Sequence, residues 1–222
     1  GITTRELDKV AEEFIRDNGA VPTFKGFPNQ YGDPFLGSLC TSVNDEVVHG
    51  IPSKDRILQD GDIVSLDAGL IHEGYHSDAA RTHAVGNISE EAKRLIEVTK
   101  QSFFEGIKLA VPGNHLFDIS EAIQKYVESN GYSVVRDLVG HGIGTHLHED
   151  PQIPNFKQRR KGMKLRPGMT LAIEPMVNEG SYDVVWLDDD WTVVTEDGSL
   201  AAHYENTIVI TEDGCEILTL SE

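Results

Sequence analysis

The sequence predicts an α+β protein in which helices cover one face of a mainly antiparallel sheet. Three observations support this prediction. Three long segments carry apolar residues with the period of a helix. Short β-branched segments lie between and after them, and Gly-containing turns join several of these segments, which favours antiparallel pairing. Finally, the same order of segments recurs in the two halves of the chain, which indicates a duplicated unit.

Helical periodicity appears near the start of each half and again at the end of the first half. Asn-Gly pairs, which favour helix ends, stop the first and third helical segments. The first segment carries an apolar face that we expect to be buried, made of Leu7, Val10, Ala11, Phe14 and Ile15. The predicted helices are Thr4–Asp17, Ser89–Ala110 and Leu116–Ser129.

The strand segments are short and rich in Val, Ile and Thr, which suit a pleated, half-buried chain. We predict strands at Ile63–Leu66, Ala79–Val85, Met169–Ile173, Thr192–Thr195, Thr207–Thr211 and Glu216–Leu220. Three dipeptides are typical of hairpin turns, so we expect a hairpin at each of Glu73-Gly74, Asp197-Gly198 and Asp213-Gly214.

Two alignments of the chain with itself indicate the duplication. The first helix aligns with the third, so that Phe14 meets Tyr126. Further on, Leu58–Asp67 aligns with Leu165–Glu174, and the two acids fall at the same place. Because no Pro-, Gly- or Ser-rich linker separates the copies, we predict one domain over residues 1–222, with internal halves of about 1–110 and 111–222.

The composition narrows the function classes. The chain has 19 Lys and Arg against 37 Asp and Glu, and its net charge of −18 repels the phosphates of nucleic acids and of anionic membranes. We therefore expect no sequence-specific nucleic-acid binding, and no apolar run is long enough to span a membrane. Two distant cysteines make no disulfide framework and the polar start does not resemble a signal peptide, so we expect a reduced, cytoplasmic protein.

Four carboxylates stand out because each lies in or beside an apolar strand. Asp67 and Asp78 flank the predicted turn at Glu73-Gly74, so their Cβ atoms should lie about 5 to 8 Å apart in the hairpin. Like charges this close are unfavourable unless a cation lies between them; alternatively, one carboxylate points to solvent. Glu174 is the repeat counterpart of Asp67, and Glu205 precedes another apolar strand. The same two alternatives, a bound cation or a carboxylate that points to solvent, therefore apply to both.

Three histidines lie beside a glycine or near the end of an apolar run: His49, His141 and His148. Taken singly, His49 and His141 are more often structural residues than ligands. Together with the four carboxylates, the histidines form an oxygen-rich set that suits Mn²⁺, Fe²⁺ or Co²⁺ and tolerates Zn²⁺. Four carboxylates exceed the charge of one divalent ion, so two bridged ions balance them better. Since the common zincin, thiolate-zinc and serine-hydrolase motifs are missing, the residues predict a dinuclear metallohydrolase of unknown substrate.

Six segments carry a more specific signal, including Gly-His-Gly-Ile-Gly around His141 and Ile-Glu-Pro around Glu174. They are Cys40–Pro52, Gly61–Asp67, Gly74–Thr82, Gly140–Pro151, Ala172–Val177 and Tyr204–Ile208. In this order they resemble type I methionine aminopeptidases, which have the pita-bread metallopeptidase fold, and the similarity runs from Gly1 to about Leu220. The resemblance implies pseudo-twofold halves and a curved antiparallel sheet with helices on its outer face.

The resemblance also implies the roles of individual residues. Two divalent ions (Co, Mn, Fe(II) or Zn) would be bound by Asp67, Asp78, His141, Glu174 and Glu205. Asp67 would be bidentate on one ion, Asp78 and Glu205 would bridge, and a monovalent cation is a further cofactor compatible with the resemblance. A metal-activated hydroxide would attack the peptide carbonyl, with Glu174 as the proton shuttle. His148 would stabilise the developing oxyanion, and His49 would bind the scissile amide or the free amine.

The implied reaction removes the initiator methionine from nascent proteins and peptides when the second residue is small. The methionine side chain would lie in a pocket made of Phe24, Phe27, Cys40, Leu147 and Trp191. Nascent peptide N-termini and the ribosome are the implied partners of a monomer. Two rivals stay open: an X-Pro aminopeptidase or prolidase, which usually carries a large extra N-terminal domain, and a non-catalytic binding module, which typically loses ligands.

Four features depart from the family pattern. One N-terminal helix of the family is not found in the sequence, and Asn206 stands where histidine is frequent. Asn29–Gly37 is an extra stretch beside the predicted pocket wall, which leaves the shape of the pocket open. Tyr182–Asp190 is acidic where bacterial relatives often carry lysines facing ribosomal RNA. We therefore expect any ribosome contact to depend on the basic cluster formed by Lys157, Arg159, Arg160, Lys161, Lys164 and Arg166.

Overall fold

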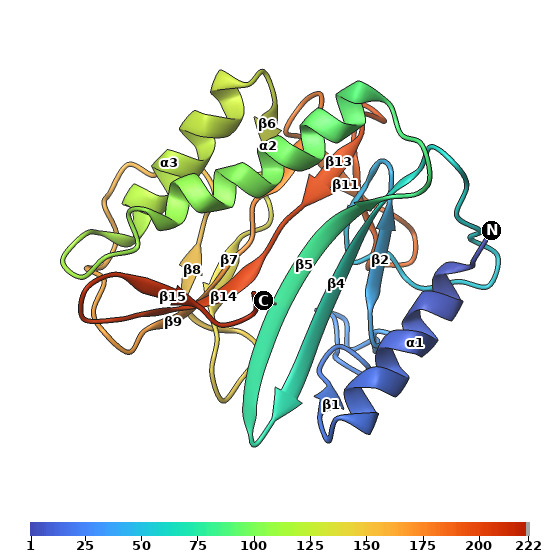
Figure 1. Ribbon diagram of the computed structural model, residues 1–222, viewed down its shortest axis with the longest axis horizontal. Coiled ribbons are helices and arrows are strands. Elements are labelled where there is room, and N and C mark those ends of the chain that lie inside the picture. Colours follow the sequence, from blue (N-terminus) through green and yellow to red (C-terminus); the bar gives the residue numbers. More distant parts are fainter. Residues whose placement is uncertain (221–222) are drawn as a thin grey trace.

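The computed structural model describes residues 1–220. Its helices are α1 (Thr4–Asp17), α2 (Glu90–Ile107) and α3 (Leu116–Ser129). A capping box fixes the start of α1: the Thr3 side chain accepts from the backbone N–H of Glu6, and the Glu6 carboxylate accepts from the N–H of Thr3. Helices α2 and α3 pack against each other, while α1 lies apart from them, beside β1 and β2 (Figure 1).

The first half is built around a long hairpin. Strand β4 (Ile63–His72) pairs antiparallel with β5 (Tyr75–Ala84) over its whole length, and the turn residues Glu73 and Gly74 both have positive φ. On the other edge of β4, β2 (Cys40–Val43) and β1 (Val21–Pro22) lie end to end (Figure 1). The hairpin predicted at this turn is confirmed. Both strands are longer than predicted, since β4 continues past Asp67 and β5 begins at Tyr75.

The second half repeats this arrangement with broken strands. Strands β9 (Thr170–Ile173) and β10 (Met176–Asn178) take the place of β4, while β14 (Asn206–Ile210) and β13 (Ala201–His203) take that of β5. Strands β7 (Gly140–Gly142) and β6 (Ser133–Val134) correspond to β2 and β1. The register is kept as well, because the pair Gly69↔Asp78 corresponds to Met176↔His203. The duplicated, antiparallel α+β architecture is therefore confirmed.

The two halves meet along a seam between β5 and β14. At its centre, the backbone N–H of Ala80 donates to the carbonyl of Glu205 at 3.4 Å, and the N–H of Glu205 donates back at 3.0 Å. Two equivalent hydroxyls flank this pair, and each bonds both the N–H and the C=O of one residue in the other half: Thr207 on Asp78 at 3.0 Å, and Thr82 on His203 at 2.9 Å. The seam therefore lies on the pseudo-twofold axis.

The largest hydrophobic core lies between α2, α3 and the strands of the second half. Gly106 in α2 faces Ile123 in α3 so closely that a Cβ atom would lie 2.6 Å from it, which lets the two helices pack tightly. The remaining strands border the cavity or extend the sheets: β3 (Glu46–Val48), β8 (Glu149–Ile153), β11 (Val184–Trp186), β12 (Val193–Thr195) and β15 (Cys215–Ile217). Within residues 1–220, no helix is both long and apolar enough to cross a membrane.

Several predicted details are wrong. Helix α2 ends at Ile107 instead of Ala110, because the following backbone N–H groups turn back to the carbonyls of Gly106 and Ile107. On α1, Val10 and Phe14 are 62% and 70% exposed, so the predicted apolar face is only partly buried.

The turn at Asp197-Gly198 does not form a hairpin, because β12 pairs with β3 and β11 whereas β13 pairs with β10. The hairpin predicted at Asp213-Gly214 is confirmed by the pairing of β14 with β15. Strand β15 ends at Ile217, short of the predicted Leu220. Strands β1 to β3, β6 to β8, β10, β11 and β13 were not predicted.

Candidate metal centre

A cavity of about 650 Å³, lined by both halves, contains every residue that the sequence predicted for the site. Acidic and imidazole side chains line one part of it, and aromatic and aliphatic side chains line another. The predicted residues that line the cavity are Phe24, Phe27, Cys40, His49, Asp67, Asp78, His141, Leu147, His148, Glu174, Trp191 and Glu205. The structure thus brings them together, while their individual roles stay predictions.

The first two acids come from the hairpin of β4 and β5. Asp67 pairs with Ala80, and Asp78 pairs with Gly69, so the two carboxylates lie one diagonal apart on one face of the hairpin. Both are buried, with exposed fractions of 9% and 4%. The alternative that one of these carboxylates points to solvent is therefore wrong.

The other two acids lie at the breaks in the second hairpin. Glu174 follows β9, and its backbone carbonyl accepts from the side-chain amide of Asn155 at 3.0 Å. Glu205 lies between β13 and β14, on the seam, and is 2% exposed. Each acid thus lies in an interruption between two strands and lines the cavity.

His141, in β7, is held in a single tautomer. Its Nδ1 lies 2.9 Å from the carbonyl oxygen of Gly142, and because a carbonyl only accepts, Nδ1 must carry the proton. In the neutral ring, Nε2 is then an acceptor, and it lies 3.5 Å from Oε1 of Glu174. Two acceptors this close repel each other unless a proton or a cation lies between them. A cation between a histidine nitrogen and a carboxylate oxygen is the arrangement expected of two ligands of one metal ion.

Burial and mutual repulsion make this cluster unfavourable without a cation. Burial raises the pKa of Asp78 to about 7. Burial, and secondly the charge of Asp78, raises the pKa of each of Asp67, Glu174 and Glu205 well above its usual range. Burial lowers the pKa of His141 to about 4, so its ring is neutral at pH 7 and free to bind a metal.

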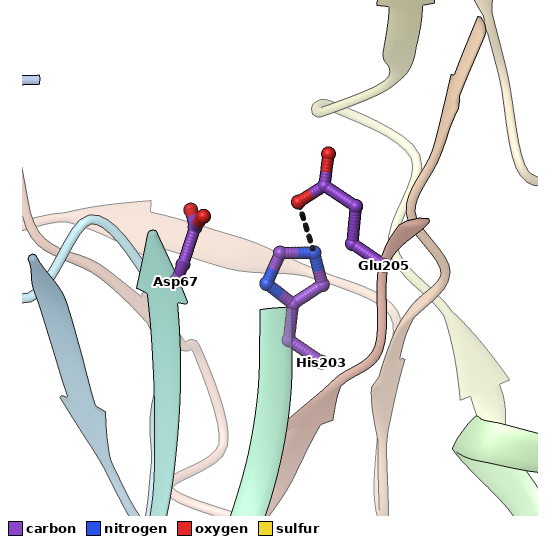
Figure 2. Close-up of side chains that lie close together, drawn as sticks. All are labelled: Asp67, His203 and Glu205. Atoms are coloured by element: carbon purple, nitrogen blue, oxygen red, sulfur yellow. Dashed lines mark ion pairs between the residues drawn. The ribbon is translucent and has the colours of Figure 1, made fainter. Parts of the chain in front are cut away.

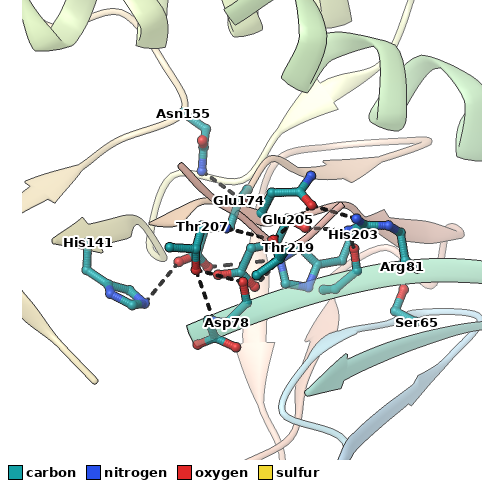
Figure 3. A network of polar contacts seen from close by, with 12 residues as sticks. Ser65, Asp78, Arg81, His141, Asn155, Glu174, His203, Glu205, Thr207 and Thr219 are labelled. Carbon is teal, nitrogen blue, oxygen red and sulfur yellow. Dashed lines mark hydrogen bonds and ion pairs between the residues drawn. The ribbon is translucent and has the colours of Figure 1, made fainter. Parts of the chain in front are cut away.

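The donor atoms fit divalent cations. Among residues 1–220, Oδ1 of Asp67, Oδ1 of Asp78 and Oε1 of Glu205 are buried without a hydrogen-bond partner. Two triplets have ligand atoms within 4.8 Å of one another and share Glu205: Asp67, His203 and Glu205 (Figure 2), and Asp78, His141 and Glu205 (Figure 3). Unpartnered carboxylate oxygens beside neutral imidazoles are donors that Mn²⁺, Fe²⁺, Co²⁺ and Zn²⁺ accept.

His203 was not predicted from the sequence. It ends β13, is 2% exposed, and its Nε2 lies 3.9 Å from Oε2 of Glu205. Figure 3 shows His203 and His141 on opposite sides of the glutamates. The available signal was spacing, because residues two apart in an extended chain point to the same face, and His203 lies two residues before Glu205.

Apolar side chains close one end of the cavity. Phe24, Cys40 and Leu147 are buried there, and Phe27 and Trp191 pack against them. Phe35 was not predicted; it is 2% exposed, lines the same cavity and contacts Trp191 with ring centroids 5.1 Å apart. Its backbone N–H donates to the carbonyl of Phe27 at 2.8 Å. The extra stretch Asn29–Gly37 therefore supplies part of the pocket wall.

Two more histidines flank the acids. The ring of His148 lies edge-on to His141, with 4.5 Å between centroids, and to Phe27, with 5.3 Å. His49 follows β3 in a left-handed conformation, with φ of 60°, and packs edge-on to Trp191. Burial lowers the pKa of His49 to about 4 and also lowers the pKa of His148, so both rings are neutral at pH 7 and can donate one N–H.

Three other features noted in the sequence lie outside the cavity. Oδ1 of Asn206 accepts from the Arg81 guanidinium at 2.6 Å, and Arg81 also bonds the backbone carbonyl of Glu205. The acidic segment contains β11 and the turn that leads to its partner β12, and Trp186 in β11 is 50% exposed. All side chains of the basic cluster are exposed: Lys157, Arg159, Arg160, Lys161, Lys164 and Arg166.

Comparison with known proteins gives consistent results. Residues 1–212 match Metallopeptidase family M24. A methionine aminopeptidase of Clostridium acetobutylicum is 60% identical, over 100% of this chain and 87% of that protein. The crystal structure of a methionine aminopeptidase from Thermotoga maritima matches with a TM-score of 0.95 at 48% identity, covering 100% of this chain and 87% of that one.

A prolidase from Pyrococcus horikoshii has a TM-score of 0.75 at 24% identity, and 55% of its length is covered, which indicates a common fold alone. The pita-bread fold expected from the sequence is thereby confirmed, as is a hydrolase of the metallopeptidase class. The family match over most of the chain, together with relatives of this identity and coverage, shows that the chain belongs to metallopeptidase family M24.

Proposed function

We propose that this protein is a methionine aminopeptidase, which removes the N-terminal methionine from proteins and peptides whose second residue is small. One observation carries the proposal: a cluster of buried carboxylates and histidines adjoins an apolar pocket within a single cavity. The names and the high identity of the relatives support the same activity.

Five residues are the proposed ligands of two divalent ions: Asp67, Asp78, His141, Glu174 and Glu205. Glu205 lies beside Asp67 in one group of clustered donor atoms and beside Asp78 and His141 in the other, which supports two ion sites that share this residue. Four carboxylates also match the charge of two divalent ions. When bound, such ions polarise the peptide carbonyl and lower the pKa of water, the nucleophile of peptide hydrolysis.

The side chains around the cluster would bind and orient the substrate. The Glu174 carboxylate, whose pKa burial raises, is suited to take a proton from water and pass it to the leaving amine. His148 would donate an N–H to the carbonyl oxygen as negative charge develops there. His49, which packs on Trp191 and lines the same cavity, would bond the scissile amide or the free amine.

The apolar end of the cavity accounts for the choice of methionine. Methionine is unbranched and flexible, and its sulfur makes favourable contacts with aromatic rings. Phe24, Phe27, Phe35 and Trp191 supply four such rings, and the Cys40 thiol is a further soft contact. A β-branched or charged first residue would fit this end poorly.

Peptide hydrolysis after metal loading tests the proposal. Protein loaded with Mn²⁺ or Co²⁺ should release methionine from Met-Ala-Ser. Glu174→Gln should lower kcat by about 10²–10⁴-fold, and its metal content, measured separately, distinguishes lost metal from lost proton transfer. Cleavage of X-Pro dipeptides alone would identify a prolidase-like enzyme, and a protein with neither metal nor activity would be a binding module; either result refutes the proposal.

We further propose that the enzyme meets nascent N-termini at the ribosome, in the cytoplasm and as a monomer. The exposed basic cluster supports this, because it is a positive patch on a chain of net charge −18. Reversing the charge of Arg159 and Arg160 should weaken co-sedimentation with ribosomes at low salt. Unchanged co-sedimentation would show that the cluster has no such role.

A further inference from the structure

His203 is a buried imidazole with neither ring nitrogen bonded. Its side chain is 2% exposed, and within the described chain neither Nδ1 nor Nε2 has a hydrogen-bond partner. Buried polar groups are nearly always bonded, so this ring needs an explanation. The residue lies in the metal centre, yet it is not one of the five proposed ligands.

The Nε2 atom of His203 faces two carboxylates of the cluster. It lies 3.9 Å from Oε2 of Glu205 and 4.0 Å from Oε2 of Glu174. Figure 2 shows the ring between Glu205 and Asp67. Both distances exceed a hydrogen bond, but a small rotation of either glutamate side chain would close one.

Two roles are compatible with this position, a metal ligand and a hydrogen-bond donor. A metal-binding histidine normally has its second ring nitrogen anchored, as Nδ1 of His141 is by the carbonyl of Gly142. In residues 1–220, Nδ1 of His203 has no such anchor. If Nε2 carries the proton instead, its N–H points at two carboxylate oxygens. Nδ1 is then an acceptor, and it is the only ring nitrogen left without a partner. The donor role therefore fits the surroundings better.

The pseudo-twofold symmetry explains how the side chain reaches the cluster. The N–H and C=O of His203 are both fixed by the hydroxyl of Thr82 on the seam. The equivalent position in the first half is Asp78, a proposed ligand. The second half thus presents a neutral donor where the first presents an acid, and such a donor favours charged carboxylates without adding charge.

We propose that His203 is a positioning residue of the metal centre, whose Nε2–H donates to the carboxylates of Glu174 and Glu205 and holds them in the orientation that binds the ions. The inference rests on the metal centre proposed above. It adds a donor that fixes two of the ligands, which is the kind of contact on which metal affinity commonly depends.

Two substitutions separate the donor from the bulk of the ring. His203→Gln keeps an N–H donor near the end of the side chain, whereas His203→Leu removes it and stays apolar. We expect His203→Leu to weaken Mn²⁺ binding by about 10- to 100-fold in calorimetric titration, while His203→Gln stays close to wild type. His72→Leu, at the exposed end of β4, is the matched control and should not change the affinity.

The protonation state of the ring gives a readout independent of activity. In zinc-loaded wild-type protein, nitrogen NMR should find the His203 proton on Nε2 and no metal on either nitrogen. A metal-bound nitrogen, a glutamine variant as weak as the leucine variant, or an unaffected leucine variant would overturn the proposal.

If His203→Leu fails to fold, the nitrogen shifts of the wild-type ring decide alone. Wild-type protein that binds no divalent ion would refute the metal centre itself. That outcome differs from normal metal binding by both wild type and His203→Leu, which would refute only the role of His203.

Discussion

Replacing Asp78 by asparagine should stabilise the metal-free protein at neutral pH. Asp78 is 4% exposed and lies in one cavity with three other acidic side chains of the cluster. Burial raises its pKa from 3.8 to about 7. The unfolded chain therefore loses this proton near pH 4, while the folded, metal-free protein keeps it up to about pH 7. Folding becomes less favourable as the pH rises between these two values.

The size of the effect follows from the shift. One pKa unit corresponds to about 1.4 kcal/mol, so Asp78 costs the metal-free protein about 4 kcal/mol at pH 7 relative to pH 4. Asparagine has nearly the same shape and no charge to bury. The free energy of unfolding of the variant minus that of wild type should thus rise by about 1.4 kcal/mol per pH unit between pH 5 and pH 7. Buried histidines with lowered pKa values have the opposite pH dependence, but they titrate in both proteins and cancel in the difference.

Urea unfolding at pH 5, 6, 7 and 8, after removal of metal with a chelator, measures this difference. Asp213→Asn, at the exposed turn between β14 and β15, is the matched control and should stay within about 0.5 kcal/mol of wild type at each pH. At saturating Mn²⁺, wild type should instead have the higher free energy of unfolding than Asp78→Asn, because the ions stabilise the protein whose ligands are intact. A difference that is flat or falls with pH would refute the claim that Asp78 is protonated in the folded, metal-free protein.

Three further predictions concern the apolar pocket, the substrate carbonyl and α1. Phe35→Ala should raise kcat/KM for peptides beginning with Phe relative to Met by about 10-fold in direct competition, and an unchanged ratio would exclude Phe35 from the specificity wall. His148→Ala should lower kcat about 10²-fold with a smaller change in KM, because a donor to the developing oxyanion acts mainly in the transition state; a change in KM alone would contradict this role. Ile15→Ala should lower the free energy of unfolding by about 2–4 kcal/mol in urea, whereas Phe14→Ala, at a side chain 70% exposed, should change it by less than about 0.5 kcal/mol. The reverse order would mean that α1 packs through its other side.

Elements whose ends depend on nearby residues could be predicted from the sequence. Helices α1 and α3 have the predicted bounds, because their caps and the Asn-Gly pairs that end them lie within a few residues of each terminus. The hairpin at Glu73-Gly74 depends on equally local turn chemistry. Most of the short strands could not be predicted, because they contain too few residues to show a period and many of their partners are distant in sequence, as when Cys40 pairs with Asp67.

The same distinction applies to the site. Acids within apolar strands are conspicuous in the sequence, because charge is rarely buried without a partner. For His203, the spacing of two residues from Glu205 indicates only a shared face of the strand, and the register with Met176 in β10 is needed to place it opposite the other acids. Phe35 depends on the path of a loop that no periodicity describes. The exposure of Val10 and Phe14 has a related cause: periodicity identifies one face of a helix, but not what covers it.

The two copies of the hairpin carry different residues at the equivalent positions around the acidic cluster. The cross-strand pair Asp67 and Ala80 in the first half corresponds to Glu174 and Glu205 in the second, and Asp78 corresponds to His203. If every one of these equivalent positions were acidic, the metal centre would contain six carboxylates, and their repulsion would raise each pKa further. Alanine at position 80 and histidine at position 203 keep the number at four, which is the charge that two divalent ions neutralise. Divergence between the halves, more than their symmetry, therefore gives the proposed metal centre a charge that two divalent ions can balance.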